Sequence, residues 1–517
     1  MATSTPPERR PHGPALLPDD PSDAALLAQV RPAGWVNPAP RDRYHLVVIG
    51  GGTGGLVTAA IAAGLGARVA LVERGLLGGD CLNVGCVPSK ALLRAARAWH
   101  EARRAAPDFG GPGVTGVGDF PRVMERMRRI RAELSPVDGA ARFKGLGVDV
   151  FLGEGRFTGP ATLDVAGARL HFRRAVIATG GRPVVPEVPG LADSGFLTNE
   201  TVFTLTELPR RLVIVGAGPI GCELGQAFAR FGSQVTVVDS ADRILASDDP
   251  DAAAVVRAAL ERDGVRFRLG SRLAAVERAV AGTVIRLADA AAGDDAVDAD
   301  RILIATGRRP EFSALALDAA GVRAGPKGIE VDARMRTSNR RIFAIGDVAS
   351  RYRFTHTADA QARMVVPNAL FFGLGGGKTT RLVVPWCTYT DPEVAHTGSS
   401  AADLDAAGVA YDSVTVPLTE VDRARLDGET SGFLRVHVAR RGDAILGATL
   451  VSAHAGETIS ELTLAIRSGL GLGKLGTTIH PYPTVSEALR KAADARSRGR
   501  LTPAARRVLD VFLGLFR

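Results

Sequence analysis

Two of the four cysteines, Cys81 and Cys86, lie five residues apart and directly precede a segment rich in Ala, Leu and Arg that is typical of a helix. Glycines precede the pair, and Pro88 follows it; proline is favoured in the first turn of a helix. The dipole at a helix N-terminus stabilises a thiolate and can lower a cysteine pKa from about 8.5 to roughly 3.5–7.5. The spacing therefore indicates a reversible dithiol/disulfide pair.

Two other uses of a cysteine pair fit this sequence less well. A closed zinc site needs about four ligands, and no second Cys or His pair has metal-ligand spacing. A permanent structural disulfide is not expected without an export signal, and no secretory pattern is recognised near the start. We therefore expect a cytoplasmic enzyme without a resident metal ion.

A glycine motif lies upstream of the cysteines. The apolar run 45–49 predicts a buried parallel strand, a small-residue helical segment covers 56–65, and a second strand is predicted over 68–72. Three glycines of the motif, Gly50, Gly52 and Gly55, lie between the first strand and the helix, and Glu73 follows the second strand. Such glycines admit a pyrophosphate to the helix N-terminus, and the acid binds ribose hydroxyls. The stretch predicts a dinucleotide site.

The same arrangement recurs after a predicted strand over 211–215. Its motif residues are Gly216, Gly218, Gly221 and Asp239, and the acid again stands 18 residues after the third glycine. The duplication predicts two nucleotide sites on one chain. A carboxylate accepts a hydrogen bond from a free ribose 2′-hydroxyl and repels a 2′-phosphate. Asp239 therefore favours NADH over NADPH, although the nearby Arg243 leaves NADPH open.

Together these motifs resemble those of the class I pyridine nucleotide–disulfide oxidoreductases, a family that includes mercuric reductase, dihydrolipoamide dehydrogenase and glutathione reductase. The stretch 78–90 resembles the redox-active motif of the family, and the resemblance covers roughly residues 43–498. It implies an α/β fold with two Rossmann-like dinucleotide-binding domains, for FAD and NAD(P)H, and a C-terminal α+β domain that forms a homodimer. It also implies that electrons pass from NAD(P)H through FAD to a Cys81–Cys86 disulfide, with Cys86 facing the flavin and Cys81 the substrate.

The resemblance assigns roles to further residues. Lys90 and Glu223 are expected to pair near the flavin, since burying either charge alone would be costly. Asp347, in a Gly-Asp pair after a predicted strand, would hold the ribityl chain of FAD, and His356 would begin a helix that reaches the flavin. Two strands that end in Ala-Thr-Gly add the expected cofactor contacts Thr179, Gly180 and Gly307.

The chain is predicted to divide into several parts. They are a flexible N-terminal arm (1–42), the first part of the FAD domain (43–200), the NAD(P) domain (201–320), the second part of the FAD domain (321–380), the interface domain (381–498) and an amphipathic tail (499–517). A patch at 35–38 is a candidate for docking the arm. We expect the tail to pack on the dimer, because one short helix with few basic residues binds membranes weakly.

The composition argues against a nucleic-acid partner and against a membrane span. Hydrophobic residues make up 46% of the 517 residues and charged ones 23%, as in globular proteins. The net charge is +9, but the basic residues are scattered and aromatics reach only 5%, so a nucleic-acid partner is not expected. The apolar stretch 47–72 is interrupted by glycines and predicts no membrane span.

The C-terminal region departs from the disulfide-reducing members of the family, which carry a His-Pro pair and, five residues after the His, a Glu as acid/base groups. Aligning the chain on Pro483 and Glu487 puts Tyr482 at the histidine position, and His480 lies two residues out of register. A tyrosine, with a pKa near 10, is a poor general base at neutral pH. Mercuric reductase also has tyrosine there, so the resemblance indicates a mercuric-reductase-like enzyme that passes electrons to a thiol-bound metal ion or another soft acceptor.

One feature opposes efficient mercury reduction, and two alternative functions stay open. Mercuric reductase hands over the metal from a C-terminal cysteine pair, whereas no cysteine follows Cys387 here. The first alternative is a reductase of small disulfides or a dihydrolipoamide dehydrogenase, against which the missing histidine argues. The second is a non-enzymatic flavin redox sensor, against which the intact cysteines, Lys90 and Glu223 argue.

Overall fold

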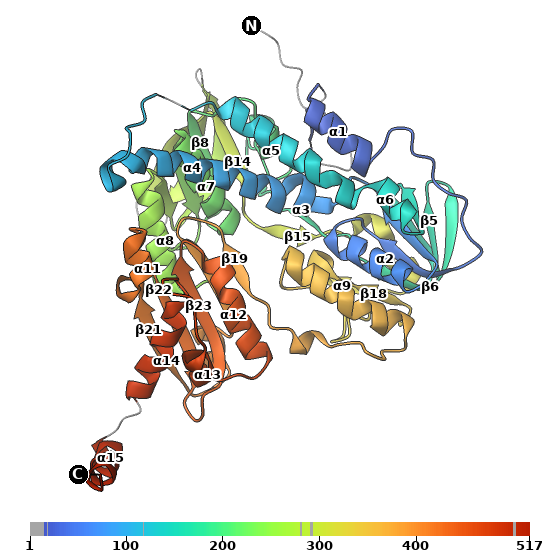
Figure 1. The fold of residues 1–517 in the computed structure, drawn as a ribbon. Coiled ribbons are helices and arrows are strands. Elements are labelled where there is room, and N and C mark those ends of the chain that lie inside the picture. The colour runs from blue at the N-terminus through green and yellow to red at the C-terminus, as the bar shows by residue number, and fades with distance from the viewer. Residues whose placement is uncertain are drawn as a thin grey trace. The chain divides into compact units, whose positions relative to one another are not determined.

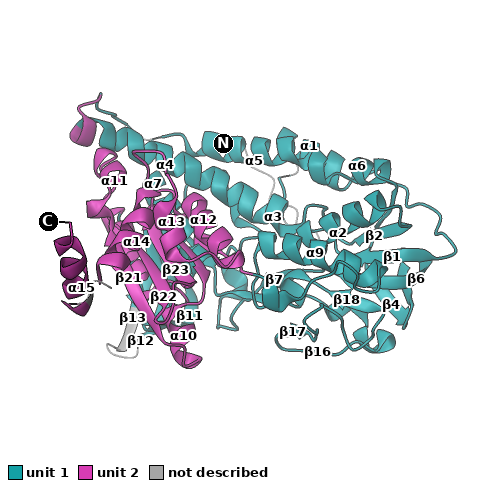
Figure 2. Cartoon of the chain, turned by 60° about the horizontal axis from the view of Figure 1, so that its bottom comes forward, with its two compact units in different colours: residues 1–106, 112–242, 264–382 teal, residues 107–111, 243–263, 383–517 magenta. Residues whose placement is uncertain are grey.

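The computed structural model describes residues 15–17, 19–116, 118–279, 282–289, 293–499 and 503–516. The chain separates into two compact units (Figure 2). Unit 1 comprises residues 1–106, 112–242 and 264–382, and unit 2 comprises residues 107–111, 243–263 and 383–517.

A seven-stranded sheet organises the first half of unit 1. Its order is β3-β2-β1-β6-β5-β4, with β18 also paired to β6. The strands are β1 (Tyr44–Ile49), β2 (Val69–Glu73), β3 (Val148–Leu152), β4 (Gly155–Gly159), β5 (Thr162–Val165), β6 (Ala168–Ile177) and β18 (Ile342–Ala344). In β1, Leu46 and Val48 face one apolar cluster, while Val47 and Ile49 face another. The strand is buried on both faces, as its continuous apolar run predicts.

A second, four-stranded parallel sheet has the order β10-β9-β8-β14. Its strands are β8 (Arg211–Val215), β9 (Gln234–Asp239), β10 (Arg266–Leu269) and β14 (Arg301–Ile304). After β10 the chain forms an antiparallel sheet of β11 (Ser271–Ala279), β12 (Gly282–Asp289) and β13 (Gly293–Ala299). Two short two-stranded sheets complete the unit. They are β7 (Gly181–Pro183) with β15 (Arg308–Pro310), and β16 (Ala324–Gly325) with β17 (Gly328–Ile329). In the first sheet, β3, β2, β1, β6 and β18 are parallel, while β4 and β5 are antiparallel. This parallel part and the parallel second sheet match the predicted duplication.

Helices that lie wholly or mainly in unit 1 surround these sheets. They are α1 (Pro21–Val30), α2 (Thr53–Gly64), α3 (Gly79–Val84), α4 (Cys86–Phe109), α5 (Phe120–Leu134), α6 (Ala140–Gly145), α7 (Pro219–Phe231) and α9 (Thr355–Leu370). Helices α2 and α7 each follow the first strand of their sheet, β1 and β8. This strand–turn–helix order places a helix N-terminus at each glycine motif.

The N-terminal arm differs from the flexible segment predicted over 1–42. Residues 1–14 and 18 lie outside the described part, but α1 packs beside α5 (Figure 1) with Leu26 and Val30 fully buried. Asp23 of α1 forms a buried ion pair with Arg131 of α5. The expected docking patch is present, since the Trp35 indole donates to the carbonyl of Val150 at 3.1 Å. The prediction of flexibility is therefore wrong for α1, because α5 supplies the cation that Asp23 needs. It is also wrong for the segment after α1, because Trp35 and Asn37 bind backbone carbonyls of β3.

Unit 2 contains an antiparallel sheet of order β19-β20-β23-β22-β21. Its strands are β19 (Trp386–Thr388), β20 (Glu393–Gly398), β21 (Tyr411–Pro417), β22 (Phe433–Ala439) and β23 (Ile445–Ser452). Its helices are α8 (Pro250–Arg262), α10 (Ala401–Ala406), α11 (Asp422–Leu426), α12 (Ala455–Arg467), α13 (Leu472–Thr477), α14 (Glu487–Gly499) and α15 (Pro503–Gly514). Apolar residues of α12 and α14 pack with Leu434 and Val436 of β22 in one core. The mixed α/β class is as predicted, while the finer domain boundaries stay a prediction.

Candidate active site

The two glycine motifs form the same turn in their respective sheets. Gly50 and Gly216 both have positive φ, +106° and +116°, which only glycine adopts readily. A Cβ on Gly55 would lie 1.8 Å from the oxygen of Gly50, and one on Gly221 would lie 1.9 Å from the oxygen of Gly216. A side chain is therefore excluded at Gly55 and at Gly221, so each glycine turn packs closely on the start of its helix, as in a pyrophosphate-binding turn.

The acid of each motif also supports its glycine turn. Glu73 accepts hydrogen bonds from the backbone N–H groups of Gly51 and Gly75. In the second motif, Asp239 accepts hydrogen bonds from the backbone N–H groups of Ala217 and Ala241, at 2.6 and 2.8 Å. A carboxylate has about four acceptor positions, so each acid keeps capacity for a ribose hydroxyl. The sequence predicted only the ribose contact.

A pocket of about 350 Å³ joins the first glycine turn to the cysteine pair. The predicted cofactor residues that line it are Gly50, Gly52, Glu73, Lys90, Thr179, Gly180 and Asp347. Cys81, Cys86 and Glu223 line it as well. The glycines and acid of the second turn, Gly216, Gly218, Gly221 and Asp239, are not among its lining residues, and neither is Gly307. The first glycine turn and the dithiol therefore share one cavity, and the second glycine turn does not line it.

The cysteines are free thiols in this structure, so it shows the reduced dithiol. Cys81 lies in α3 and Cys86 begins α4. A hydrogen bond from the Cys81 thiol lowers the pKa of Cys86 to about 6, and the Thr355 hydroxyl and the Lys90 charge act in the same direction. The same bond, together with burial, raises the pKa of Cys81. At neutral pH the pair therefore consists of a Cys86 thiolate that accepts a hydrogen bond from a Cys81 thiol.

Thr355, from a distant segment, and Lys90, from the same helix, both stabilise the Cys86 thiolate. The Thr355 hydroxyl, on the first turn of α9, lies 3.4 Å from its sulfur. Lys90, one turn along α4, donates to Glu223 of α7 at 2.7 Å. Glu223 is nearly buried, with 6% of its side chain exposed, and a buried carboxylate needs such a partner. The expected Lys90–Glu223 contact is thus present, and Thr355 is a contact that the sequence did not predict.

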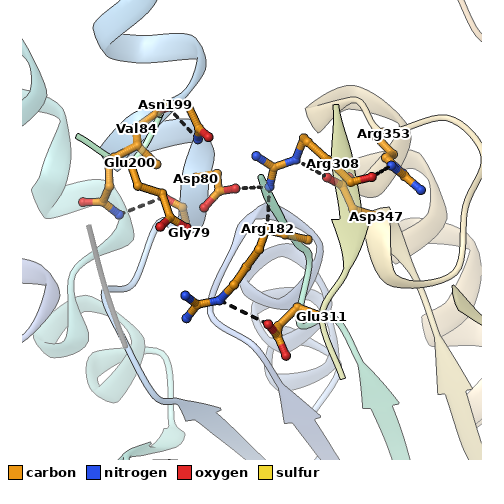
Figure 3. A network of polar contacts seen from close by, with 12 residues as sticks. Gly79, Asp80, Val84, Arg182, Asn199, Glu200, Arg308, Glu311, Asp347 and Arg353 are labelled. Atoms are coloured by element: carbon orange, nitrogen blue, oxygen red, sulfur yellow. Dashed lines mark hydrogen bonds and ion pairs between the residues drawn. The ribbon is translucent and has the colours of Figure 1, made fainter. Parts of the chain in front are cut away.

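A half-buried arginine, Arg308, links the cysteine motif to Asp347, the predicted ribityl contact (Figure 3). The Arg308 guanidinium pairs with Asp80, next to Cys81, and with Asp347 at 3.3 Å. It also donates to the carbonyl of Gly181 at 2.6 Å, while Arg353 donates to the Arg308 carbonyl. Sequence reasoning missed Arg308, although it directly follows the second Ala-Thr-Gly. The arginine gives the pocket a fixed cation suited to an anionic cofactor.

His356 does not occupy the position predicted for it. Thr355 and Ala358 of α9 line the pocket, but His356 does not. Its exposed ring stacks on Phe354, with ring centroids 5.3 Å apart. Residues three apart share a helix face, whereas the residue between them points elsewhere. Thr355 rather than His356 therefore faces the pocket, and a cofactor contact of His356 stays a prediction.

The predicted acid/base residues lie in unit 2. Tyr482 is 71% exposed, and its hydroxyl donates to Asp422 at 2.9 Å. That hydrogen bond raises the pKa of Tyr482 above its ordinary value. Glu487 is buried at the start of α14 and pairs with Arg490 and Lys491 of its own helix. Tyr482 is therefore a neutral hydrogen-bond donor at neutral pH rather than a base.

His480 forms a separate pair in the same unit. Its Nε2 lies 2.8 Å from a carboxylate oxygen of Glu461, and only 9% of its side chain is exposed. A histidine held by a carboxylate is a common proton-transfer arrangement. The sequence placed His480 out of register and did not predict its partner.

Comparisons with known proteins agree with this site. The model of the pyridine nucleotide-disulphide oxidoreductase family matches residues 44–362, and that of its dimerisation domain matches residues 384–493. A mercuric reductase from Staphylococcus aureus is 34% identical over 452 residues, which cover 87% of this chain and 82% of that protein. A dihydrolipoyl dehydrogenase from Thermus scotoductus is 35% identical over 467 residues, 87% of this chain and 97% of that protein.

A solved structure extends the likeness to the fold. The Cu(II) complex of the HOCl-induced flavoprotein disulfide reductase RclA from Escherichia coli superposes with a TM-score of 0.77 at 27% identity, over 88% of this chain and all of that one. The chain belongs to the pyridine nucleotide–disulphide oxidoreductase family. Within it, the protein is a class I enzyme that depends on FAD and NAD(P) and carries the family's dimerisation domain. No helix in the described residues has the length and apolar character needed to cross a membrane.

Proposed function

We propose that this enzyme passes electrons from NADH, by way of FAD and the Cys81–Cys86 pair, to a thiolate-bound soft metal ion or another soft acceptor. The proposal rests on the hydrogen bond that the Tyr482 hydroxyl donates to Asp422. Because this hydrogen bond raises the tyrosine pKa, the side chain cannot take a proton from a thiol at neutral pH. The position that serves as acid/base in disulfide-reducing relatives is therefore unsuited to that work here.

A metal acceptor removes the need for such a base. A coordinating metal ion deprotonates a thiol outright, so the Cys81 proton passes to the departing thiolate of the metal complex as the Cys81–metal bond forms. The Cys86 thiolate already exists at neutral pH, since its pKa is lowered to about 6 by the Cys81 hydrogen bond. A small disulfide would instead require Cys81, whose pKa is raised, to lose its proton to a base. The residues thus favour a metal complex over a disulfide.

The first site fits FAD through its own residues. The side-chain-free turn at Gly50 and Gly55 suits a pyrophosphate, Asp347 lines the same pocket and would accept a hydrogen bond from a polyol chain, and Arg308 supplies a cation. FAD supplies hydride acceptance and electron transfer when bound. The chain's own contribution is to hold Cys86 as a thiolate in the same pocket and to balance Lys90 with Glu223.

The relatives support the metal acceptor in part. Mercuric reductases are among the proteins to which the chain is similar, and RclA has been solved as a Cu(II) complex. Cys81 and Cys86 both line the pocket. We therefore propose that the acceptor arrives as a small-molecule thiolate complex and exchanges directly onto Cys81.

The second nucleotide site supports NADH as the electron donor. Asp239 ends β9 beside the second glycine turn, where its charge would repel a 2′-phosphate. Arg243, which could have offset that charge, donates to the carbonyls of Ala246 and Asp248 instead. We propose a homodimer through the dimerisation domain, in the cytoplasm, where thiols stay reduced.

Steady-state oxidation of NADH by the purified holoenzyme tests the proposal. We expect turnover with Hg(II) in excess thiol that disappears in Cys81→Ala, and slow turnover with lipoamide or glutathione disulfide. Cys387→Ala, which changes a cysteine of unit 2, serves as the matched control and should retain turnover. Rapid disulfide turnover without metal turnover would overturn the proposal.

A disulfide reductase is the second candidate, and the His480–Glu461 pair favours it. If His480 transfers the proton in place of Tyr482, His480→Ala should abolish disulfide turnover while Tyr482→Phe preserves it. Metal-dependent turnover should be insensitive to both substitutions under the first proposal.

A further inference from the structure

The C-terminal helix α15 has a wide apolar face, and the side chains on it whose burial is described are exposed. The exposed apolar side chains of the helix and its last turn are Val508, Leu509, Val511, Phe512, Leu513, Leu515 and Phe516, each at least 45% exposed. Phe512 and Phe516 contact each other edge to face, with centroids 5.3 Å apart. So large an apolar face is not stable in water on its own and marks an interaction site.

The apolar face is too wide for a single helical partner. Successive side chains are about 100° apart around a helix, so the apolar side chains fill an arc of roughly 200°, with Val511 at one edge and Leu513 at the other. A helix packed on a protein core presents an apolar stripe of about 100°. Asp510 lies in the middle of the remaining arc, and Arg506 and Arg507 flank it at the two margins of the apolar face. A flat apolar medium covers such an arc more completely than a second helix does.

The charges around the helix select an anionic surface. Five arginines and a single acidic residue, Asp510, occur between positions 498 and 517 of the sequence. In the described residues, Arg498, Arg506 and Arg507 form no ion pair, and Arg506 and Arg507 are exposed at the margins of the helix. Arginines near an anionic lipid surface each strengthen binding by several-fold, and this attraction is screened by salt.

We propose that α15 docks the enzyme on the surface of a membrane that contains anionic phospholipids, with its apolar face at the boundary of the acyl chains and its arginines among the headgroups. The helix has 12 residues, too few to span a bilayer, so it lies along the surface. The docking surface is independent of the dithiol and of the identity of the electron acceptor. It differs from the dimer contact expected of the tail, because the tail carries more positive charge than the helix alone suggested.

Vesicle sedimentation with the full-length holoenzyme tests the proposal. We expect sedimentation with vesicles of phosphatidylcholine and phosphatidylglycerol, little with phosphatidylcholine alone, and release as the salt rises from about 0.1 M to about 1 M. Leu513→Glu should weaken binding at least about ten-fold, since it removes an apolar side chain from the acyl boundary and adds a repelled charge. The double variant Arg506→Glu, Arg507→Glu should lose the part of its vesicle binding that depends on salt.

Leu65→Glu is the matched control, because Leu65 and Leu513 are both 57% exposed and Leu65 lies just after α2 in unit 1. It should bind vesicles like the parent enzyme, and all variants should keep their flavin and their oligomeric state. Equal sedimentation of Leu513→Glu and Leu65→Glu would overturn the proposal. So would an absence of vesicle binding together with a dimer that dissociates in Leu513→Glu, which would assign the face to contact between two copies of the chain.

Discussion

At the scale of single residues, the chemistry depends on which sulfur carries the charge. The Cys86 thiolate is stabilised by three donors or cations, from Cys81, Thr355 and Lys90. The first and third belong to the motif that contains the cysteines, and both were predictable from local spacing. Thr355 comes from a segment 269 residues further along the chain, so no local pattern could reveal it. The sequence indicated the reactive pair but not the residue that tunes it.

Replacing Thr355 by valine should raise the pKa of Cys86. The hydroxyl stabilises the thiolate, so its loss moves the midpoint from about 6 towards the ordinary value for a thiol. At pH 7 the parent enzyme should hold about nine tenths of Cys86 as thiolate, and Thr355→Val should hold less. The measurement is the pH profile of iodoacetamide labelling of the reduced protein, with each cysteine quantified by mass spectrometry. Thr355→Ser, which keeps the hydroxyl, should retain the parent midpoint; an unchanged midpoint in Thr355→Val would refute the assignment.

Replacing Tyr482 by histidine should create disulfide reductase activity. Histidine titrates near neutral pH, and Asp422, the present partner of the tyrosine hydroxyl, is available to orient an imidazole. General acid–base catalysis contributes typically 10²–10⁴-fold, so we expect a rise of at least about ten-fold in lipoamide turnover. Tyr482→Phe is the control and should not gain this activity. No gain in Tyr482→His would show that the slow step with disulfides lies elsewhere.

At the scale of elements, α1 is fixed to the molecule by charges that lie far apart in the sequence. Arg131 of α5 pairs with Asp23 of α1 and donates to the carbonyl of Asn83 in α3 at 2.8 Å. One guanidinium therefore ties the N-terminal helix to the helix that carries Cys81. The two members of the ion pair stand 108 residues apart. This separation is why the segment looked like a flexible arm from composition alone, whereas the strand–glycine–helix units, whose signals are local, were predicted correctly.

Asp23→Ala should detach α1 and destabilise unit 1. The change leaves Arg131 buried without its carboxylate, and breaking a buried pair costs about 3–5 kcal/mol. Hydrogen exchange of the α1 amides should speed up, and the chemical denaturation midpoint should fall. Asp42→Ala, at an exposed acid that follows α1 in the chain, is the matched control and should change neither. Slow exchange in α1 of the Asp23→Ala protein would mean that Leu26 and Val30 hold the helix without the ion pair.

At the scale of the whole molecule, the duplication places two equivalent acids in two different sites. Glu73 and Asp239 each order a glycine turn through a pair of backbone hydrogen bonds, so the two halves differ in what else surrounds the turn. The first turn opens into the pocket that contains the dithiol and Arg308, whereas the second does not. That difference could not be read from the motifs, since the partners of Arg308 come from segments on both sides of the second motif.

Removing the charge of each acid should therefore have a different effect: loss of flavin for Glu73, and altered use of the nicotinamide nucleotide for Asp239. Glu73→Gln weakens one hydrogen bond to its turn and one to a ribose, so the protein should be purified with a reduced flavin content and should regain activity when FAD is added. Asp239→Asn should keep a full complement of flavin, raise KM for NADH, and improve the NADPH/NADH ratio of kcat/KM by about ten-fold, because the charge that repels a 2′-phosphate is gone. Flavin absorbance per protein and steady-state kinetics with both nucleotides separate the outcomes. If Asp239→Asn lost flavin while Glu73→Gln kept it, the assignment of FAD to the first turn and of the nicotinamide nucleotide to the second would have to be reversed.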